Sequence, residues 1–148
     1  GSGALRGLRV LNLAKTFPGV PGVRALAEAA ALAGVRSLDL SANRLGPTAV
    51  KLVAESKAAK GLRVLNLSAN PVGDSGAAAL ADSKALAGLL DLDLADAGLT
   101  DAGATALAES PYLGGLLRLN LTSHSIGRPC GEAARKALVD RFGRHVAL

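Results

Sequence analysis

His124 and Cys130 are the residues whose types and spacing come closest to those of a nucleophilic catalytic pair. A cysteine reacts as its thiolate and needs a base within hydrogen-bond distance. In the repeat frame described below, however, Cys130 falls in a column of small, inward-facing residues, and His124 falls where a structural asparagine is expected. We therefore interpret Cys130 as a buried, unreactive thiol and His124 as a hydrogen-bonding turn residue rather than a pH switch. The sequence predicts no catalytic residue.

Metal and nucleotide sites need spacings that this sequence lacks. Two histidines, His124 and His145, and one cysteine give no metal-ligand spacing, so we predict neither a metal site nor a cofactor. Gly1-Ser2-Gly3 is not a phosphate-binding loop, because no strand precedes it and no third glycine follows in register. We interpret residues 1–3 as the remnant of a cleaved expression tag.

Carboxylates gathered in the middle of the chain are the remaining candidates for a functional site. Asp91, Asp93 and Asp96 lie close together in sequence, and Asp39 is expected to lie near them in space. An acidic patch on a rigid surface suits a basic protein partner. The predicted partner-binding residues, all expected on one face of a sheet, are Asp39, Asn66, Asp91, Asp93, Asp96 and Asn120.

The net charge of +5 is unevenly distributed along the chain. Residues 1–63 hold ten Lys or Arg against three acids, residues 64–117 hold one against seven, and residues 118–148 hold six against two. The acidic middle interrupts a continuous basic stripe, and only Phe17, Tyr112 and Phe142 could stack on bases. The sequence therefore favours a protein partner over nucleic acid.

The composition predicts one soluble domain over residues 4–148. A chain of 148 residues with 49% apolar residues can bury a single core. Its apolar runs are broken before the roughly 20 residues that would cross a bilayer, and no charged-then-apolar leader opens it. A single cysteine fits a reducing compartment. We therefore expect a cytoplasmic protein that contacts no membrane.

Leucines recur every 27 residues along the chain. Each phrase has a second leucine two residues after the first, which predicts a short strand with one buried face. A segment rich in Ala and Gly follows, and its residues at helical spacing, such as Gly76, Leu80 and Ser83, predict a helix. Asp74 and Asp101 precede two of these helices, where a carboxylate can accept free backbone N–H groups. The leucine pairs are Leu11 and Leu13, Leu38 and Leu40, Leu65 and Leu67, Leu92 and Leu94, and Leu119 and Leu121.

Two phrases, LRVLNLSANPV at 62–72 and VRSLDLSANRL at 35–45, carry the pattern L-x-x-L-x-L-x-x-N-x-L. On this pattern the chain resembles the leucine-rich repeat family. Its Ala-rich helical halves resemble the ribonuclease-inhibitor-like subclass, and its composition looks bacterial. The resemblance implies an α/β fold, a right-handed β-α solenoid of five 27-residue repeats with a parallel concave sheet and convex helices. It also implies that Asn43 and Asn70 hydrogen-bond the backbone of adjacent turns.

Two further columns of the repeat frame carry structural predictions. The asparagine column holds other residues at positions 16, 97 and 124, so we expect the fourth repeat, with Asp96 and Ala97, to turn differently. A column of small residues is expected to let each helix lie close to the sheet; it holds Gly22, Ala49, Gly76, Gly103 and Cys130. An acidic row is expected on the solvated side of the helices; it holds Glu28, Glu55, Asp82 and Glu109.

The two ends of the array are predicted to differ. Val146 and Leu148 continue the leucine frame, so RHVAL predicts a short sixth strand after a helix at GEAARKALVDRF. Phe142 would cover the end of the core, and residues 128–148 would form a C-terminal cap. No polar cap precedes Leu5, so the first strand should have an open edge that allows weak self-association or takes a partner domain.

The resemblance implies a non-catalytic protein–protein interaction module that binds a protein partner on its concave face. Two alternatives stay open at this point. The chain could be the structural, C-terminal capping segment of a longer repeat protein. It could also regulate an enzyme such as a GTPase.

Overall fold

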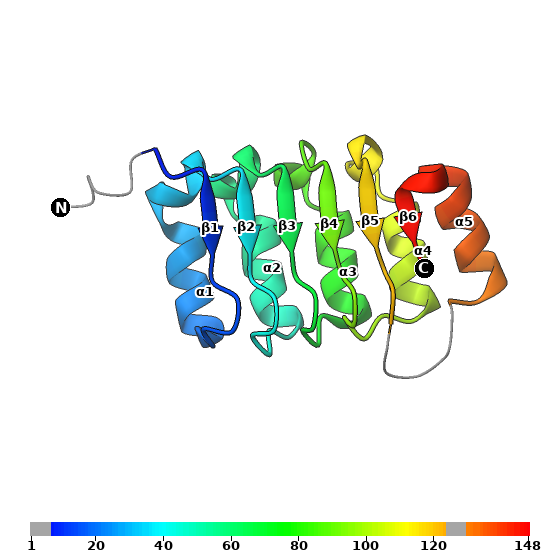
Figure 1. Cartoon of the computed structure of the whole chain (residues 1–148), viewed down its shortest axis with the longest axis horizontal. Coiled ribbons are helices and arrows are strands. Elements are labelled where there is room, and N and C mark those ends of the chain that lie inside the picture. The colour runs from blue at the N-terminus through cyan, green and yellow to red at the C-terminus, as the bar shows by residue number, and fades with distance from the viewer. Residues whose placement is uncertain (1–6, 124–129) are drawn as a thin grey trace.

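A computed structural model describes residues 7–123 and 130–148, whose strands and helices form two layers (Figure 1). Six strands make one parallel sheet in which the spatial order follows the chain from β1 to β6. The strands are β1 (Val10–Asn12), β2 (Ser37–Asp39), β3 (Val64–Asn66), β4 (Asp91–Asp93), β5 (Arg118–Asn120) and β6 (Val146–Ala147). The α-helices are α1 (Gly19–Glu28), α2 (Pro47–Glu55), α3 (Gly73–Ala81), α4 (Asp101–Ala108) and α5 (Glu132–Phe142).

A short 3-10 helix follows each α-helix and returns the chain to the sheet. Val35 and Leu62, which end two of these returns, are fully buried. Each repeat is therefore a strand, a turn, an α-helix and a 3-10 return. The 3-10 helices are Ala30–Gly34, Lys57–Gly61, Lys84–Leu86, Leu113–Gly115 and Gly143–His145.

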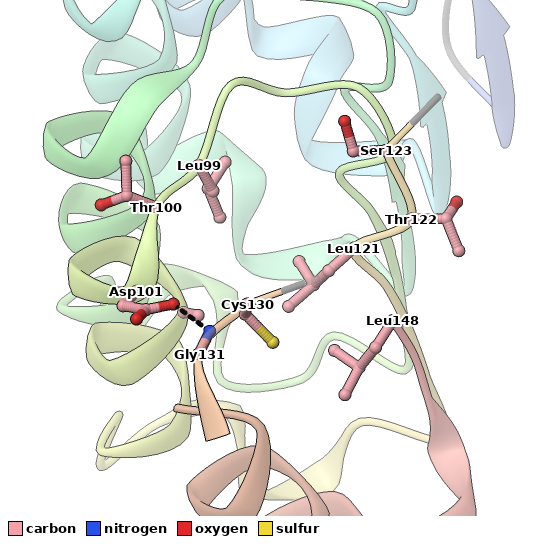
Figure 2. A pocket seen from close by; sticks show the side chains of 10 residues that line it. Leu99, Thr100, Asp101, Leu121, Thr122, Ser123, Cys130, Gly131 and Leu148 are labelled. Atoms are coloured by element: carbon pink, nitrogen blue, oxygen red, sulfur yellow. Dashed lines mark hydrogen bonds between the residues drawn. The ribbon is translucent and has the colours of Figure 1, made fainter. Parts of the chain in front are cut away.

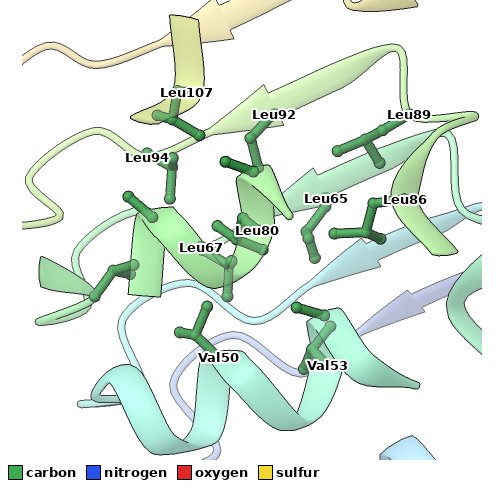
Figure 3. Packing of buried hydrophobic residues seen from close by; sticks show 14 of the residues in the cluster. Val50, Val53, Leu65, Leu67, Leu80, Leu86, Leu89, Leu92, Leu94 and Leu107 are labelled. Atoms are coloured by element: carbon green, nitrogen blue, oxygen red, sulfur yellow. The ribbon is translucent and has the colours of Figure 1, made fainter. Parts of the chain in front are cut away.

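The sheet register follows the leucine spacing without a slip. Leu38 pairs with Leu65, and Leu65 pairs with Leu92. Leu65 and Leu67 have no exposed surface, and they pack with leucines of α3 and of the neighbouring strands (Figure 3). One repeat cannot enclose its own leucines, so stacking neighbours supplies the burial, roughly 1.5–3 kcal/mol for each fully buried leucine. The predicted α/β leucine-rich-repeat solenoid is confirmed.

The predicted C-terminal elements are also present. Helix α5 matches the expected segment, and Phe142, its last residue, is only 5% exposed. Strand β6 pairs with β5, with Val146 opposite Leu119. At the other end, β1 pairs only with β2 within the described residues, and Leu11 and Leu13 are half-buried rather than fully buried. The apolar edge at β1 is therefore open in the described part of the chain.

The third residue after each of the strands β1 to β4 has the same left-handed backbone conformation, including the one in the fourth repeat. Asp96 has φ +50° and its N–H donates to the carbonyl of Thr122, just as Ala69 has φ +55° and donates to Ala95. The prediction that the fourth repeat turns differently is wrong, because aspartate tolerates the left-handed region and the bond between turns is made by backbone. The third repeat departs instead: Pro71 fixes a negative φ, and the next left-handed residue is Gly73.

The small residues that recur at the start of each helix face the neighbouring helix more than the sheet. A Cβ atom built on Gly103 would meet the carboxylate and the Cα of Asp74 in α3, at 2.5 and 3.2 Å. A Cβ on Gly76 would meet Val72 at 2.6 Å and the Cα of Pro47 in α2 at 3.6 Å. The glycines therefore allow close packing between consecutive helices, which corrects the expected helix-to-sheet role.

A row of buried serines joins the far ends of the helices. Ser83 is predicted on a helical face, but it lies beyond the end of α3, and Ser110 lies beyond the end of α4 in the same way. The hydroxyl of Ser83 donates to the carbonyl of Ala54, and that of Ser110 donates to Ala81, both over 2.5 Å. Ser56 makes the same bond to Ala27. Each serine thus satisfies a carbonyl near the C-terminal end of the α-helix that lies one repeat before its own.

Candidate functional site

The candidate site lies on the strand face, which we define as the side of the sheet β1–β6 that points away from the helices. Its side chains come from the two outward positions of each strand. Val10 and Val64 are exposed there, at 64% and 36%. The outward residues of the first five strands are Val10, Asn12, Ser37, Asp39, Val64, Asn66, Asp91, Asp93, Arg118 and Asn120.

The Asn and Asp side chains that end the strands also have a local structural task. Oδ1 of Asp39 accepts from the N–H of Ser41 at 2.9 Å, and Oδ1 of Asn66 accepts from Ser68 at 3.0 Å. Asp93 and Asn120 make the same bond to the residue two positions on. These Asx turns terminate each strand, so either residue type serves the fold, while the choice of Asp adds a charge to the strand face.

Asp91 and Asp93 are brought together as expected, but a cation accompanies them. Nη1 of Arg118 lies 3.2 Å from Oδ2 of Asp91, and Nη2 lies 3.5 Å from Oδ2 of Asp93. Nδ2 of Asn120 donates to the same Asp93 oxygen at 3.1 Å. The Arg118 side chain is 55% exposed, against 28% for Asp91 and 17% for Asp93. The carboxylates are therefore held in fixed positions and partly neutralised, which sequence reasoning missed.

Asp39 and Asp96 lie further from this cluster. The register places Asn66 of β3 between Asp39 of β2 and Asp93 of β4, so two strand spacings, roughly 10 Å, separate the two acids. Asp96 lies beyond β4, in the left-handed turn at the rim where the strands end. The predicted binding residues other than Asp96 thus lie on the consecutive strands β2 to β5, with Asp39 two strands from Asp93.

Asn43 and Asn70 connect successive turns at the strand ends. Both are buried, at 3% and 1% exposure. Oδ1 of Asn70 accepts from the N–H groups of Asn43 and Leu45, both at 2.9 Å, and its Nδ2 donates to the carbonyls of Leu40 and Leu67. Asn43 makes similar bonds one repeat earlier, except that its second N–H donor is Phe17, because the counterpart of Leu45 is a proline. Both residues therefore serve the fold and do not face a partner.

Asp74 and Asp101 cap the helix of the next repeat, not their own. Asp74 accepts from the N–H and hydroxyl of Thr100, at 2.8 and 2.6 Å, and from the N–H of Gly103 at 2.9 Å. Oδ1 of Asp101 accepts from the N–H of Gly131 at the start of α5 (Figure 2). Partial burial opposes ionisation of Asp74, but the bonds from Thr100 and Gly103 outweigh it and lower its pKa.

The residues considered for catalysis do not form a site in the described part of the chain. Cys130 is half-buried beside a hollow of about 880 Å³, which Leu121 and Leu148 also line (Figure 2). Partial burial and the Asp101 carboxylate raise the pKa of its thiol, which disfavours the reactive thiolate. The expected full burial of Cys130 is therefore wrong, because α5 begins only at Glu132. His124 lies outside the described residues.

Three further predictions concern metal sites, membrane-spanning segments and the acids on the convex side. Among residues 7–123 and 130–148, no three His, Cys, Asp or Glu side chains come together as metal ligands. None of the helices in that range has the length and apolarity to cross a membrane. The convex acidic row is exposed as predicted; it holds Glu28, Glu55, Asp82 and Glu109.

Comparison with known proteins agrees with this architecture. The sequence model of the leucine-rich repeat family matches residues 62–81 and 89–108, in the third and fourth repeats. No curated protein matches the sequence. The fold is similar to the solved tropomodulin C-terminal domain of Caenorhabditis elegans, with a TM-score of 0.68, 17% sequence identity, and coverage of 93% of this chain and 84% of that chain. With its six-stranded parallel sheet and its 27-residue register, the chain has the α/β solenoid fold of leucine-rich repeats, and two of its repeats match the sequence model of that family.

Proposed function

We propose that this chain is a non-catalytic interaction module that binds a protein partner on its strand face, the side predicted to be concave. The observation that carries the proposal is the cluster of Asp91, Asp93, Arg118 and Asn120 on β4 and β5. Its bonds hold the two carboxylates close together on the sheet, so a partner would meet both of them at one place.

The partner that we propose is basic. The outward residues of the first five strands include three aspartates and one arginine, so the strand face is net acidic. A cation of the partner would bind between Asp91 and Asp93 in competition with Arg118. Val64, exposed on the adjacent strand, would supply apolar contact beside the charges.

The test compares two double variants of equal charge change. Asp91→Asn with Asp93→Asn removes both carboxylates, and the asparagine introduced at position 93 keeps the Asx turn that Asn66 and Asn120 already make. The control, Asp82→Asn with Glu109→Gln, removes two exposed charges at the helix ends. The immobilised chain should retain a specific protein from a bacterial lysate at moderate salt, the control variant should retain it too, and the strand-face variant should lose it. Equal losses in both variants would contradict the proposal.

Finer features of the proposal rest on the sequence. The Ala-rich helices support the ribonuclease-inhibitor-like subclass, and the overall content of Ala, Gly, Leu and Arg supports a bacterial source. The single cysteine supports a cytoplasmic location. We propose residues 1–3 as a tag remnant and 128–148 as the C-terminal cap. We also propose weak self-association through the β1 edge, which a rise in average mass across a light-scattering concentration series would support and a constant monomer mass would contradict.

A further inference from the structure

Phe17 combines two features that are both unfavourable for a residue with no task beyond folding. Its side chain is 56% exposed, and its backbone has φ +52°. A bulky side chain in the left-handed region is a genuine outlier. The equivalent residues of the second and fourth repeats, Arg44 with φ +57° and Gly98 with φ +68°, have the same conformation, so the turn imposes it, and glycine is the residue that adopts it most easily. The backbone therefore does not favour a bulky residue here, and the exposed ring has no packing role in the turn that would explain it.

The open end of the solenoid does not explain the exposure of Phe17. The positions 27, 54 and 81 residues later are Arg44, Pro71 and Gly98, and all three are exposed although they lie in inner repeats. This position therefore faces solvent along the whole rim. A phenylalanine there is not a core residue that has lost its neighbour.

The ring of Phe17 is held in place by its surroundings. Its N–H donates to Oδ1 of Asn43 at 2.8 Å, which fixes the backbone on a buried side chain. The guanidinium carbon of Arg44 lies 5.4 Å from the ring centroid, within cation–π range. Rigid aromatic and arginine side chains are the residue types that dominate protein interfaces, because little entropy is lost when they bind.

The rim around Phe17 is cationic and partly apolar. Residues 14–24 and 41–51 contain Lys15, Arg24, Arg44 and Lys51 and no acid. Lys15 and Arg44 are exposed in the two turns, and Val20, at the start of α1, is 38% exposed. In the third and fourth repeats the same rim carries Asp74, Asp96 and Asp101 instead. The charge of this rim thus changes sign along the solenoid.

We infer that Lys15, Phe17 and Arg44 form a docking point for an acidic protein segment that carries an apolar side chain. The apolar side chain packs on the Phe17 ring, and flanking carboxylates pair with Arg44 and Lys15. The charge complementarity selects an acidic partner, and the exposed ring selects one with an apolar anchor. This rim site lies outside the strand face. Its test is independent of the proposed binding to the acidic cluster on β4 and β5.

Three synthetic peptides test the site against the ¹⁵N-labelled chain by NMR titration. The first, EDELFEDELF, combines acids with apolar residues; the second, EDESSEDESS, keeps only the acids; the third, SSSLFSSSLF, keeps only the apolar residues. We expect the first peptide to shift the amides of residues 15–17 and 44, and the other two to shift them little. No shift with the first peptide, or equal shifts with the second, would overturn the inference, since the latter means charge attraction alone.

Two variants and a control separate binding from folding. Phe17→Gly should weaken binding of the first peptide at least tenfold while the melting temperature stays equal or rises, because glycine accepts the left-handed backbone. Arg44→Gln, which leaves the Phe17 backbone unchanged, should also weaken binding. Leu117→Ser alters an exposed apolar residue that precedes β5, at the opposite ends of the strands, and should leave binding intact. Unchanged binding by both Phe17→Gly and Arg44→Gln would overturn the proposed site.

Discussion

Successive repeats are linked beyond the strand ends by side-chain amides in the first half of the solenoid and by helix-capping carboxylates in the second. Asn43 and Asn70 link the first three repeats through buried side-chain bonds to backbone. Asp74 and Asp101 link the third repeat to the fourth and the fourth to the helix α5. The same task, satisfying N–H groups of an adjoining repeat, is thus carried out by two chemistries in one repeat array.

The difference teaches that equal backbone geometry can hide unequal sensitivity to conditions. The asparagine side chains do not titrate, so the hydrogen bonds that link the first three repeats should persist at low pH. The carboxylate of Asp74 has a lowered pKa because its ionised form is the one that accepts these bonds. Acid should therefore weaken the second half of the solenoid first. The predictions below are ordered from the largest expected effect to the smallest.

Leu67→Ala should have the largest effect, because the third repeat is shared by both halves. Leu67 is fully buried, and its truncation removes transfer energy and leaves a cavity, about 2–5 kcal/mol. Ser68→Ala is the neighbouring control and should cost little. Urea denaturation should show one cooperative transition at a lower midpoint for Leu67→Ala. Equal midpoints for the two variants would contradict the 27-residue register.

Asn70→Ala should cost about 2–4 kcal/mol, since several buried backbone groups lose their partners at once. The loss should be the same at pH 7 and pH 4, because an amide does not titrate. Denaturation of variant and parent at both pH values measures this. A loss that shrinks on acidification would break the proposed contrast between the two halves.

Asp74→Ala should cost about 1 kcal/mol at pH 7, the usual value of a helix cap. A lowered folded pKa contributes stability above the unfolded pKa of about 3.9, and this contribution disappears as pH falls through the folded pKa. The difference between parent and variant should therefore be constant from pH 7 to about 5 and narrow below about 4. Asp82→Ala is an exposed aspartate control that should show a smaller difference.

Ala69→Gly should stabilise the chain by up to about 1 kcal/mol, because a Cβ atom makes the left-handed turn costly. Asp96→Gly should gain less, since aspartate tolerates this region better. Ala78→Gly, inside α3, should instead lose about 1 kcal/mol. Thermal melts of the three variants rank these effects, and a loss on Ala69→Gly would show that the turn conformation is wrongly assigned.

The sequence by itself determined the solenoid, its register and its C-terminal elements. Leucine pairs every 27 residues can be buried only if neighbouring repeats stack in register, so Leu65 and Leu92 had to pair. The candidate site was determined only in part. Asp91 and Asp93 were predicted because the repeat shows which strand positions point outward. Ser56, Ser83 and Ser110 also stand 27 residues apart, and this spacing could have revealed the row of serines.

Only the tertiary structure decided where the polar side chains bind. Nothing in the spacing shows that Asp74 reaches forward to Gly103 or that Ser83 reaches back to Ala54. The 27-residue spacing does place Arg118 beside Asp91, and this signal could have revealed their ion pair. Burial of a leucine depends on which face of its element it occupies, and the sequence period fixes that face. A hydrogen bond depends on distances of a few tenths of an ångström between groups of different repeats, and these distances exist only once the repeats have packed.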